Sequence, residues 1–515
     1  MEAAAGHLVA AEDWTGLADL IRAHGRGLWE QGRAQTLVSW MQAVPRSVLF
    51  GRPWFALSLA AMQLSAGSPE ASSAVLVDLE RTCELSTEER LLSDVLHCMI
   101  VLARNQPAVS FGRAEAAAAA IDQVDESQLP DLFGASTLAD VRSILGWTAA
   151  QAQLLAGDGR AVASARGAVE GPASTPIALQ VHRHATAALV EALLHNASSA
   201  SSHAQRALDL AGRHLGEGHP STPMAHVARI IVARSLNEMD RAGEHVDAAL
   251  ELAVRWHRSP MAALILAERA LISVACDEAA DAVSWLRRLE RLPSTDRSAL
   301  VDSRARAAEL RAHFALGDPA AGWDVIERAP DVMGWDLAYA GIVMALDEGD
   351  VGRAAKYLDA WPREATPFGA LERELAAAMV DHRLGDTADA RAQCERVLRQ
   401  TARLGTVRLY LDGGAACLEL LEETARAASP YVHLSDVLRT CRRATPGRPV
   451  LVDQLSPREL EVLQRLPTRL SNAEIATALF ISTNTVKTHV KHIYQKLGAS
   501  DRDDAVRKAH ELGLL

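Results

Sequence analysis

The segment Ile481-Ser-Thr-Asn-Thr-Val-Lys-Thr-His-Val490 carries the most specific structural signal in this 515-residue chain. It begins a predicted helix that runs on to Leu497, on which Val486, Val490, Ile493 and Leu497 recur at the spacing of a single helical face. We expect this apolar stripe to pack against the rest of a small helical domain, which leaves the opposite face of the helix in solvent.

That opposite face carries hydrogen-bond donors and no carboxylate. At about 100° per residue, it presents Asn484, Thr488, Lys491 and Gln495, with Lys487 beside them. The base edges of the DNA major groove are rich in acceptors, so a helix of this kind fits that groove. A polar helix face is also the ordinary appearance of a solvated surface, and the face alone does not decide between the two interpretations.

Three further helices are predicted around this one, over residues 457–466, 471–480 and 502–512. Ser456 and Ser471 each stand three residues before a glutamate, Glu459 and Glu474, which is the capping-box arrangement. The helix that begins at Ser471 ends two residues before the next one starts. Such a short connection is typical of a helix-turn-helix.

Four segments resemble the LuxR/GerE helix-turn-helix family: Leu455-Ser-Pro-Arg-Glu-Leu-Glu-Val-Leu463, Leu470-Ser-Asn-Ala-Glu-Ile-Ala476, the 481–490 stretch, and Lys496-Leu-Gly498. The closing Glu511-Leu-Gly513 agrees as well. The resemblance implies a four-helix DNA-binding domain over residues 451–515, with residues 482–497 as its recognition helix.

The resemblance also implies roles for individual residues. Those expected to reach base edges are Lys487, Thr488 and Lys491; those expected near phosphates are Ser471, Asn472, Thr483, Thr485 and His489. Asn484 and Gln495 complete the predicted DNA-binding face. In relatives the fourth helix commonly forms the dimer contact, which here would use Ala505, Val506, Ala509 and Leu512.

The sequence departs from the family pattern at two places. Pro467 stands where relatives usually continue the first helix, so we expect that helix to stop early. Asp501, Asp503 and Asp504 add negative charge near the phosphate backbone, which would weaken non-specific affinity or shift the fourth helix.

Residues 1–440 show helical spacing of apolar residues and no sustained two-residue alternation. A turn phrase punctuates them, as Leu155-Ala-Gly-Asp158, Leu316-Gly-Asp318, Leu346-Asp-Glu-Gly-Asp350 and Leu384-Gly-Asp386, with looser forms at His195-Asn196, Glu238-Met-Asp240 and Ala275-Cys-Asp277. In this phrase the glycine ends one helix in a left-handed conformation and the aspartate caps the next. A spacing of roughly 32–43 residues predicts a TPR-like solenoid, and a globular all-helical domain is the alternative.

The domain boundary is predicted at Arg443-Ala-Thr-Pro-Gly-Arg-Pro449, where two prolines and a glycine disfavour a helix. The fold class is therefore all-α, with a helical-repeat domain over 1–440, a linker over 441–450 and the helix-turn-helix domain over 451–515. The net charge of the whole chain is −12, and residues 482–497 hold three lysines, two histidines and no acid. A positive element on an acidic protein can contact phosphate locally while the remainder discourages non-specific adhesion.

Several classes of protein are disfavoured. The six cysteines are scattered, so neither a zinc site nor a disulfide framework is expected. Met261–Ala275, the best apolar run, is interrupted by Glu268 and Arg269 and is too short to span a membrane. No secretory signal, catalytic constellation, cofactor motif or metal-ligand set is apparent, so we expect a cytoplasmic protein that is not an enzyme and has no cofactor.

The helical part also resembles that of large LuxR-type regulators related to the maltose activator. The residues that carry this resemblance are Leu28-Trp-Glu-Gln-Gly-Arg33, Trp40, Pro45 and Arg52-Pro-Trp-Phe-Ala56. Those proteins carry an ATPase, whose phosphate loop needs a Gly-Lys-Ser/Thr sequence. No lysine precedes Lys356 in this chain, so we expect no such loop.

Together these features predict a bacterial transcription regulator. It would bind promoter DNA as a homodimer, act with RNA polymerase as an activator by analogy with relatives, and sense a small molecule or protein through its repeats. The alternative from another class is a protein-interaction scaffold that uses the helical tail for assembly.

Overall fold

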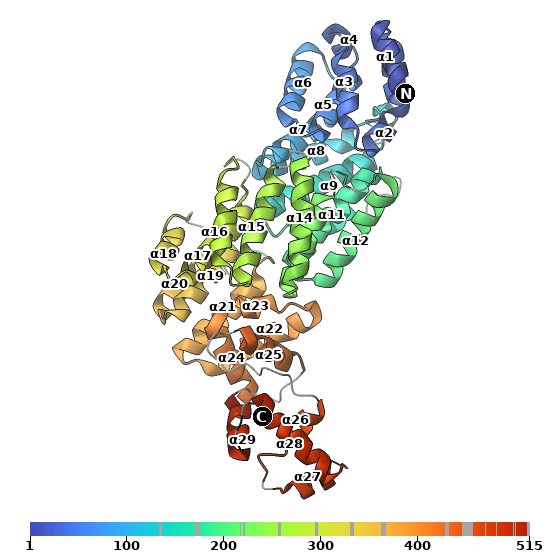
Figure 1. Cartoon of the computed structure of the whole chain (residues 1–515). Helices are drawn as coiled ribbons and strands as arrows, with labels where there is room; N and C mark the ends of the chain where they lie inside the picture. The colour runs from blue at the N-terminus through green and yellow to red at the C-terminus, as the bar shows by residue number, and fades with distance from the viewer. Residues whose placement is uncertain are drawn as a thin grey trace. The chain divides into compact units, whose positions relative to one another are not determined.

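Helix follows helix through the computed structural model, and the part of the chain that it describes contains no β-strand (Figure 1). The described residues are all but 133–135, 170–175, 217, 220–221, 256–258, 294–296, 330–333, 362–366, 428–431, 445–456, 469, 480, 498, 500 and 512–515. They divide into two compact units, Met1–Ala416 and Cys417–Leu515.

The first unit is built from helix pairs arranged in two rows. The first-row helices are α5 (Pro53–Ser65), α7 (Thr87–Ala103), α9 (Leu138–Leu155), α11 (Ile177–Leu193), α13 (Pro223–Ser235), α15 (Ser259–Ala275), α17 (Ala299–Ala315), α19 (Trp335–Asp347) and α21 (Ala370–Leu384). The second-row helices are α6 (Pro69–Thr82), α8 (Pro107–Ala120), α10 (Ala161–Val169), α12 (Ala197–His214), α14 (Met239–Arg255), α16 (Ala279–Glu290), α18 (Pro319–Glu327), α20 (Val351–Ala360) and α22 (Thr387–Leu404).

Each first-row helix packs on its own second-row partner and on the next first-row helix along the chain. This is the stacking of a helical-repeat solenoid, in which each pair buries its apolar face against its neighbours. The predicted TPR-like fold is confirmed. The remaining helices of this unit are α1 (Glu2–Ala10), α2 (Trp14–Glu30), α3 (Ala34–Gln42), α4 (Arg46–Phe50), the 3₁₀ turns Ile121–Gln123 and Glu126–Gln128, and α23 (Arg408–Leu411).

The predicted turn phrase has both the expected glycine conformation and the expected cap at two of its occurrences, whereas Asp386, in a third, makes no side-chain capping hydrogen bond. Gly317 and Gly349 end α17 and α19 with φ of 77° and 81°, a left-handed geometry that glycine adopts without steric cost. The aspartate that follows each glycine caps the next helix, because Asp318 and Asp350 accept hydrogen bonds from backbone N–H groups in the first turns of α18 and α20. One local signal therefore ends one helix and starts another.

Three equivalent turns use other residues in the same left-handed conformation. His195, Asn237 and Asp277 have φ of 59°, 63° and 63°. Asparagine and aspartate tolerate this region better than most residues with a side chain. These positions fall at the looser turn phrases predicted from the sequence. Asn237 lies one residue before the phrase predicted at Glu238-Met-Asp240.

A buried ionic network links the first-row helices of the later repeats. Glu268 of α15 is fully buried and pairs with Arg304 of α17 and with Arg234 of α13, whose Nε lies 3.2 Å from the carboxylate. Arg304 also lies 3.7 Å from Asp336 of α19, and burial raises the pKa of that aspartate. Buried charges are tolerated where they are paired, so these contacts join successive repeats through specific geometry.

The later helices are α24 (Gly414–Ala427), α25 (Val432–Ala444), α26 (Pro457–Leu463), α27 (Asn472–Ala478), α28 (Thr483–Leu497) and α29 (Arg502–Glu511). The predicted linker over 441–450 begins within α25, and its remainder lies outside the described residues. The predicted boundaries at 440 and 451 remain predictions. Across the described residues, no helix is both long and apolar enough to span a membrane.

Candidate nucleic-acid interface

Helices α26 to α29 share one small hydrophobic core. Val486, Val490 and Ile493 of α28 lie in it, at 0%, 9% and 0% exposure, together with Val462 of α26 and Ile475 of α27. The apolar stripe predicted from the sequence is therefore the buried face of α28 at these three positions. The side chain of Leu497, the fourth member, lies outside the described residues.

The start of α27 has the predicted capping box. The Ser471 N–H donates to the Glu474 carboxylate at 2.7 Å, and the Glu474 N–H donates to Ser471 Oγ at 3.4 Å. The Ser471 hydroxyl also donates to the Glu474 carboxylate, at 2.8 Å, and the two hydrogen bonds that this carboxylate accepts from Ser471 lower the pKa of Glu474. The expected cap at Ser456 lies outside the described residues. Ser471 is exposed and Asn472 is half-buried at this helix end, and their predicted phosphate contacts remain predictions.

Helix α28 starts at a second serine cap. The Thr485 N–H donates to Ser482 Oγ at 3.1 Å, and the two hydroxyls lie 2.8 Å apart. Thr483 and Thr485 are exposed, and His489 is half-buried. The predicted phosphate contacts of this helix thus gather in its first two turns.

The three lysines of α28 occupy two different environments. Lys487 and Lys491 are exposed, and neither has an ion-pair partner among the described residues. Lys496 Nζ instead lies 2.9 Å from Oε2 of Glu459, a carboxylate of α26 that is only 4% exposed. His492 Nδ1 lies 3.6 Å from the same carboxylate. One end of the helix is tied to its own domain, while Lys487 and Lys491 remain available to an external anion.

The predicted base-contacting residues lie together on this surface. Lys487, Thr488 and Lys491 are all exposed and lie within about one helical turn of one another on α28. The backbones of Asn484 and Gln495 are also in α28, but their side chains lie outside the described residues. We refer to Lys487, Thr488 and Lys491 as the exposed face of α28.

The predicted dimer contact requires a correction. Ala505 and Ala509 of α29 are fully buried in the domain's own core, so their side chains are not available to a second copy of the chain. Their small size lets α29 approach that core closely, which explains the apolar spacing seen in the sequence. Val506 is half-buried beside the same core, and Leu512 lies outside the described residues.

The two departures from the family pattern have local structural consequences. Helix α26 ends at Leu463, earlier than the predicted Leu466 and before Pro467. The Asp501 carboxylate accepts a hydrogen bond from the Asp504 N–H at 2.8 Å and so caps the start of α29. Asp504 in turn pairs with Lys508 at 3.3 Å. Two of the three added acids thus stabilise α29 locally.

One positioning residue was not anticipated from the sequence. Arg502, at the start of α29, donates from Nε to the Leu466 carbonyl at 2.9 Å and from Nη2 to the Thr468 carbonyl at 2.8 Å. These bonds satisfy backbone acceptors in the turn that follows α26. No short motif marks a contact across 34 to 36 residues, so only the folded chain reveals it.

The rest of the described chain offers no grouping of three or more His, Cys, Asp or Glu side chains that could hold a metal ion. None of the cysteines in the described part of the chain forms a disulfide, and burial raises the pKa of Cys98 to about 11. A thiol with a raised pKa is a poor nucleophile at neutral pH.

Comparisons with known proteins assign a family to this domain. Residues 453–509 match the family of bacterial regulatory proteins, luxR family. Similar curated proteins include the probable transcriptional regulatory protein NarL of Mycobacterium tuberculosis (47% identical over 74 residues, 14% of this chain and 32% of NarL). Another is the HTH-type transcriptional regulator MalT of Yersinia enterocolitica (34% identical over 84 residues, 16% of this chain and 9% of MalT). The chain spans about a third of the length of the first of these relatives.

Among solved structures, a Rap protein complexed with competence and sporulation factor is similar with a TM-score of 0.47 and 13% identity, over 69% of this chain and 99% of that one. The curated relatives named above match only 14% and 16% of the chain, and both are transcription regulators by name.

Proposed function

We propose, from the LuxR-family domain at residues 453–509, that this protein is a sequence-specific DNA-binding transcription regulator. The observation that carries the proposal is the exposed face of α28. It presents two lysines that have no ion-pair partner among the described residues, and a threonine, on a helix whose opposite face is buried in a small core. Such a helix is held rigidly by one side and offers donors to the major groove with the other.

The proposed contacts divide into two kinds. Lys487, Thr488 and Lys491 would reach base edges and specify sequence. Ser471, Asn472, Thr483, Thr485 and His489, near the starts of α27 and α28, would contact phosphates and fix the orientation of the domain on the duplex. Asn484 and Gln495 belong to the proposed DNA-binding set by their positions on α28.

We propose further that the helical repeats sense an effector, either a small molecule or a protein, and control DNA binding by the C-terminal domain. Solenoids present long surfaces suited to such ligands. The part of the predicted linker that follows α25 contains Pro446, Gly447 and Pro449 and would let the DNA-binding domain change position without unfolding. Activation of transcription through RNA polymerase, binding as a homodimer and a cytoplasmic location belong to the same proposal.

The protein-interaction scaffold is the less favoured alternative. A partner-binding helix usually exposes apolar anchors, whereas the exposed face of α28 is polar and basic.

Genome-wide mapping of the DNA sites occupied by the full-length protein tests the proposal. We expect discrete promoter sites that disappear in a chain lacking residues 451–515. Lys356→Ala is the matched control, since it removes an exposed lysine of the repeats, and it should leave the sites unchanged. Occupancy that persists without residues 451–515 would refute DNA recognition by this domain and favour the scaffold.

A further inference from the structure

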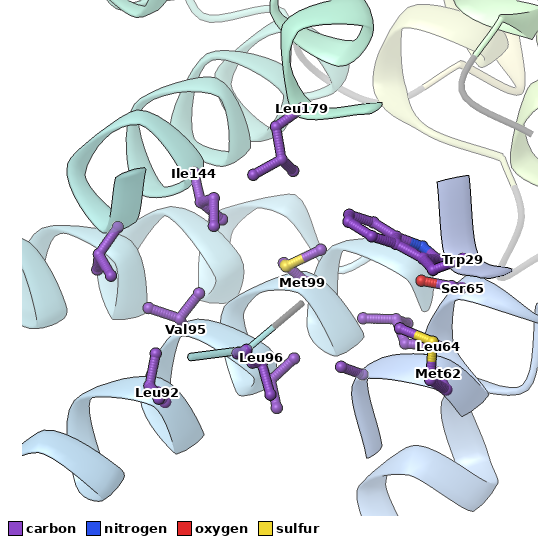
Figure 2. Close-up of a pocket in the computed structure, with 13 residues that line it drawn as sticks. Trp29, Met62, Leu64, Ser65, Leu92, Val95, Leu96, Met99, Ile144 and Leu179 are labelled. Carbon is purple, nitrogen blue, oxygen red and sulfur yellow. The ribbon is translucent and has the colours of Figure 1, made fainter. Parts of the chain in front are cut away.

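We infer that the first unit contains a binding site for the alkyl end of a small ligand. The site is a partly open cavity among α2 and the first-row helices α5, α7, α9 and α11 (Figure 2). Side chains from these helices point toward a common space, in which Met99 lies between Trp29 and Ser65 on one side and Ile144 on the other. Nothing in the family resemblance of the C-terminal domain bears on this cavity.

The lining of the cavity selects against water. Of its 13 lining residues, only Ser65 and Trp29 carry a polar side-chain atom. A buried water needs two to four polar partners, and cavities that lack them stay dry and accept apolar molecules. An apolar group of a ligand is therefore favoured over water in this cavity.

The size of the cavity limits what can enter. Its volume is about 60 Å³, whereas a cavity of about 150 Å³ accommodates a benzene ring. The enclosed part thus takes only the first few carbons of a chain or a small branched alkyl group. Because the cavity is partly open, the rest of such a ligand can extend outward and keep its polar group in water or near the Ser65 hydroxyl.

Two of the lining side chains are suited to adjust to a ligand. Met62 and Met99 are unbranched and flexible, and methionine commonly fills irregular spaces beside variable ligands. The floor below them is firmer, since Leu92, Val95 and Leu96 are all less than 4% exposed. The ligand class that fits is an alkyl-bearing small molecule with one polar end. Such a ligand would be the effector proposed above. Only its effect on transcription rests on that proposed function.

Binding can be measured without DNA on the full-length protein labelled with ¹³C at the methionine methyl groups. The probes are the straight-chain alcohols from ethanol to 1-hexanol. We expect saturable shifts of the Met62 and Met99 signals, identified by their loss in Met62→Leu and Met99→Leu. At about 0.8 kcal/mol per buried methylene, affinity should rise about fourfold for each added carbon and then level off once the chain reaches solvent.

Two variants distinguish this cavity from general partitioning into the protein. Ala61→Leu adds a larger side chain at the cavity wall and should abolish the saturable shifts. Ala149→Leu makes the same change at a half-buried alanine of α9 that packs on the same core without lining the cavity, and it should bind the alcohols as the unaltered protein does. Met99→Ala enlarges the cavity and should confer binding of benzene, which keeps the test decisive if Ala61→Leu does not fold.

Shifts that rise without saturation, or that persist unchanged in Ala61→Leu, would overturn the inference. So would a Met99→Ala protein that binds benzene no better than the unaltered protein. A protein that binds the alcohols as expected yet shows no DNA sites would refute the proposed function alone.

Discussion

Replacing a lysine of α28 by methionine keeps most of the length of the side chain and removes its charge. We expect this change to lower the stability of the domain at Lys496, and to affect DNA binding without affecting stability at Lys487 and Lys491. Lys496→Met deprives the buried Glu459 carboxylate of an ammonium group 2.9 Å away. Breaking a buried ion pair by removing one partner costs about 3–5 kcal/mol. We expect the lower end, about 3 kcal/mol, because the Lys496 side chain is itself 24% exposed, so the pair is only partly shielded from water.

Such a loss is large for a small domain, whose total stability is on the order of 0.05–0.15 kcal/mol per residue. A change of about 3 kcal/mol corresponds to roughly a 150-fold increase in the open population. Hydrogen exchange of the full-length protein, read by mass spectrometry on peptides from α26 and α28, would report it. Lys487→Met and Lys491→Met are the controls and should leave exchange unchanged, since both side chains are exposed. Unchanged exchange in Lys496→Met, or loosening in Lys491→Met, would refute this division.

The remaining predictions concern the first unit and nucleotide. Glu268→Gln should destabilise the repeats by about 3 kcal/mol or more, because it leaves Arg234 and Arg304 without their shared buried carboxylate, and the midpoint of urea denaturation would show it. Burial lowers the pKa of His184 and of His226 to about 4. Histidine in the unfolded chain titrates near pH 6.5, so the contribution of these two residues to stability is fully present above that pH and is lost progressively as the pH falls to about 4. The free energy of unfolding should therefore be lower at pH 5 than at pH 7, and this difference should be smaller in His226→Gln. ATP should raise the melting temperature by no more than about one degree and should not be needed for DNA binding, because no phosphate-loop sequence is present. An increase of several degrees in the melting temperature would reveal a nucleotide site.

The repeats were predictable because their signals are local. A glycine such as Gly317 and an aspartate such as Asp318 fix a turn through their own backbone and side-chain geometry, whatever lies far along the chain. The helical face of α28 was equally readable, because Val486, Val490 and Ile493 meet one core at one spacing.

The features that escaped prediction depend on contacts between distant segments. Arg502 caps the turn after α26, and Glu268 joins three helices, yet neither stands in a short motif. Ala505 and Ala509 were misassigned for a related reason. A small apolar stripe on a helix indicates close packing but does not tell whether the surface that it meets belongs to the same chain or to a partner.

The most direct test of the central claim is the affinity of purified full-length protein for one of its mapped promoter sites, measured by fluorescence anisotropy at matched salt. Lys491→Ala should weaken binding about 5- to 150-fold, the equivalent of about 1–3 kcal/mol for a lost base contact, while Lys356→Ala should bind as the unaltered protein does. Equal affinity of the Lys491→Ala and unaltered proteins would contradict recognition of DNA by the exposed face of α28.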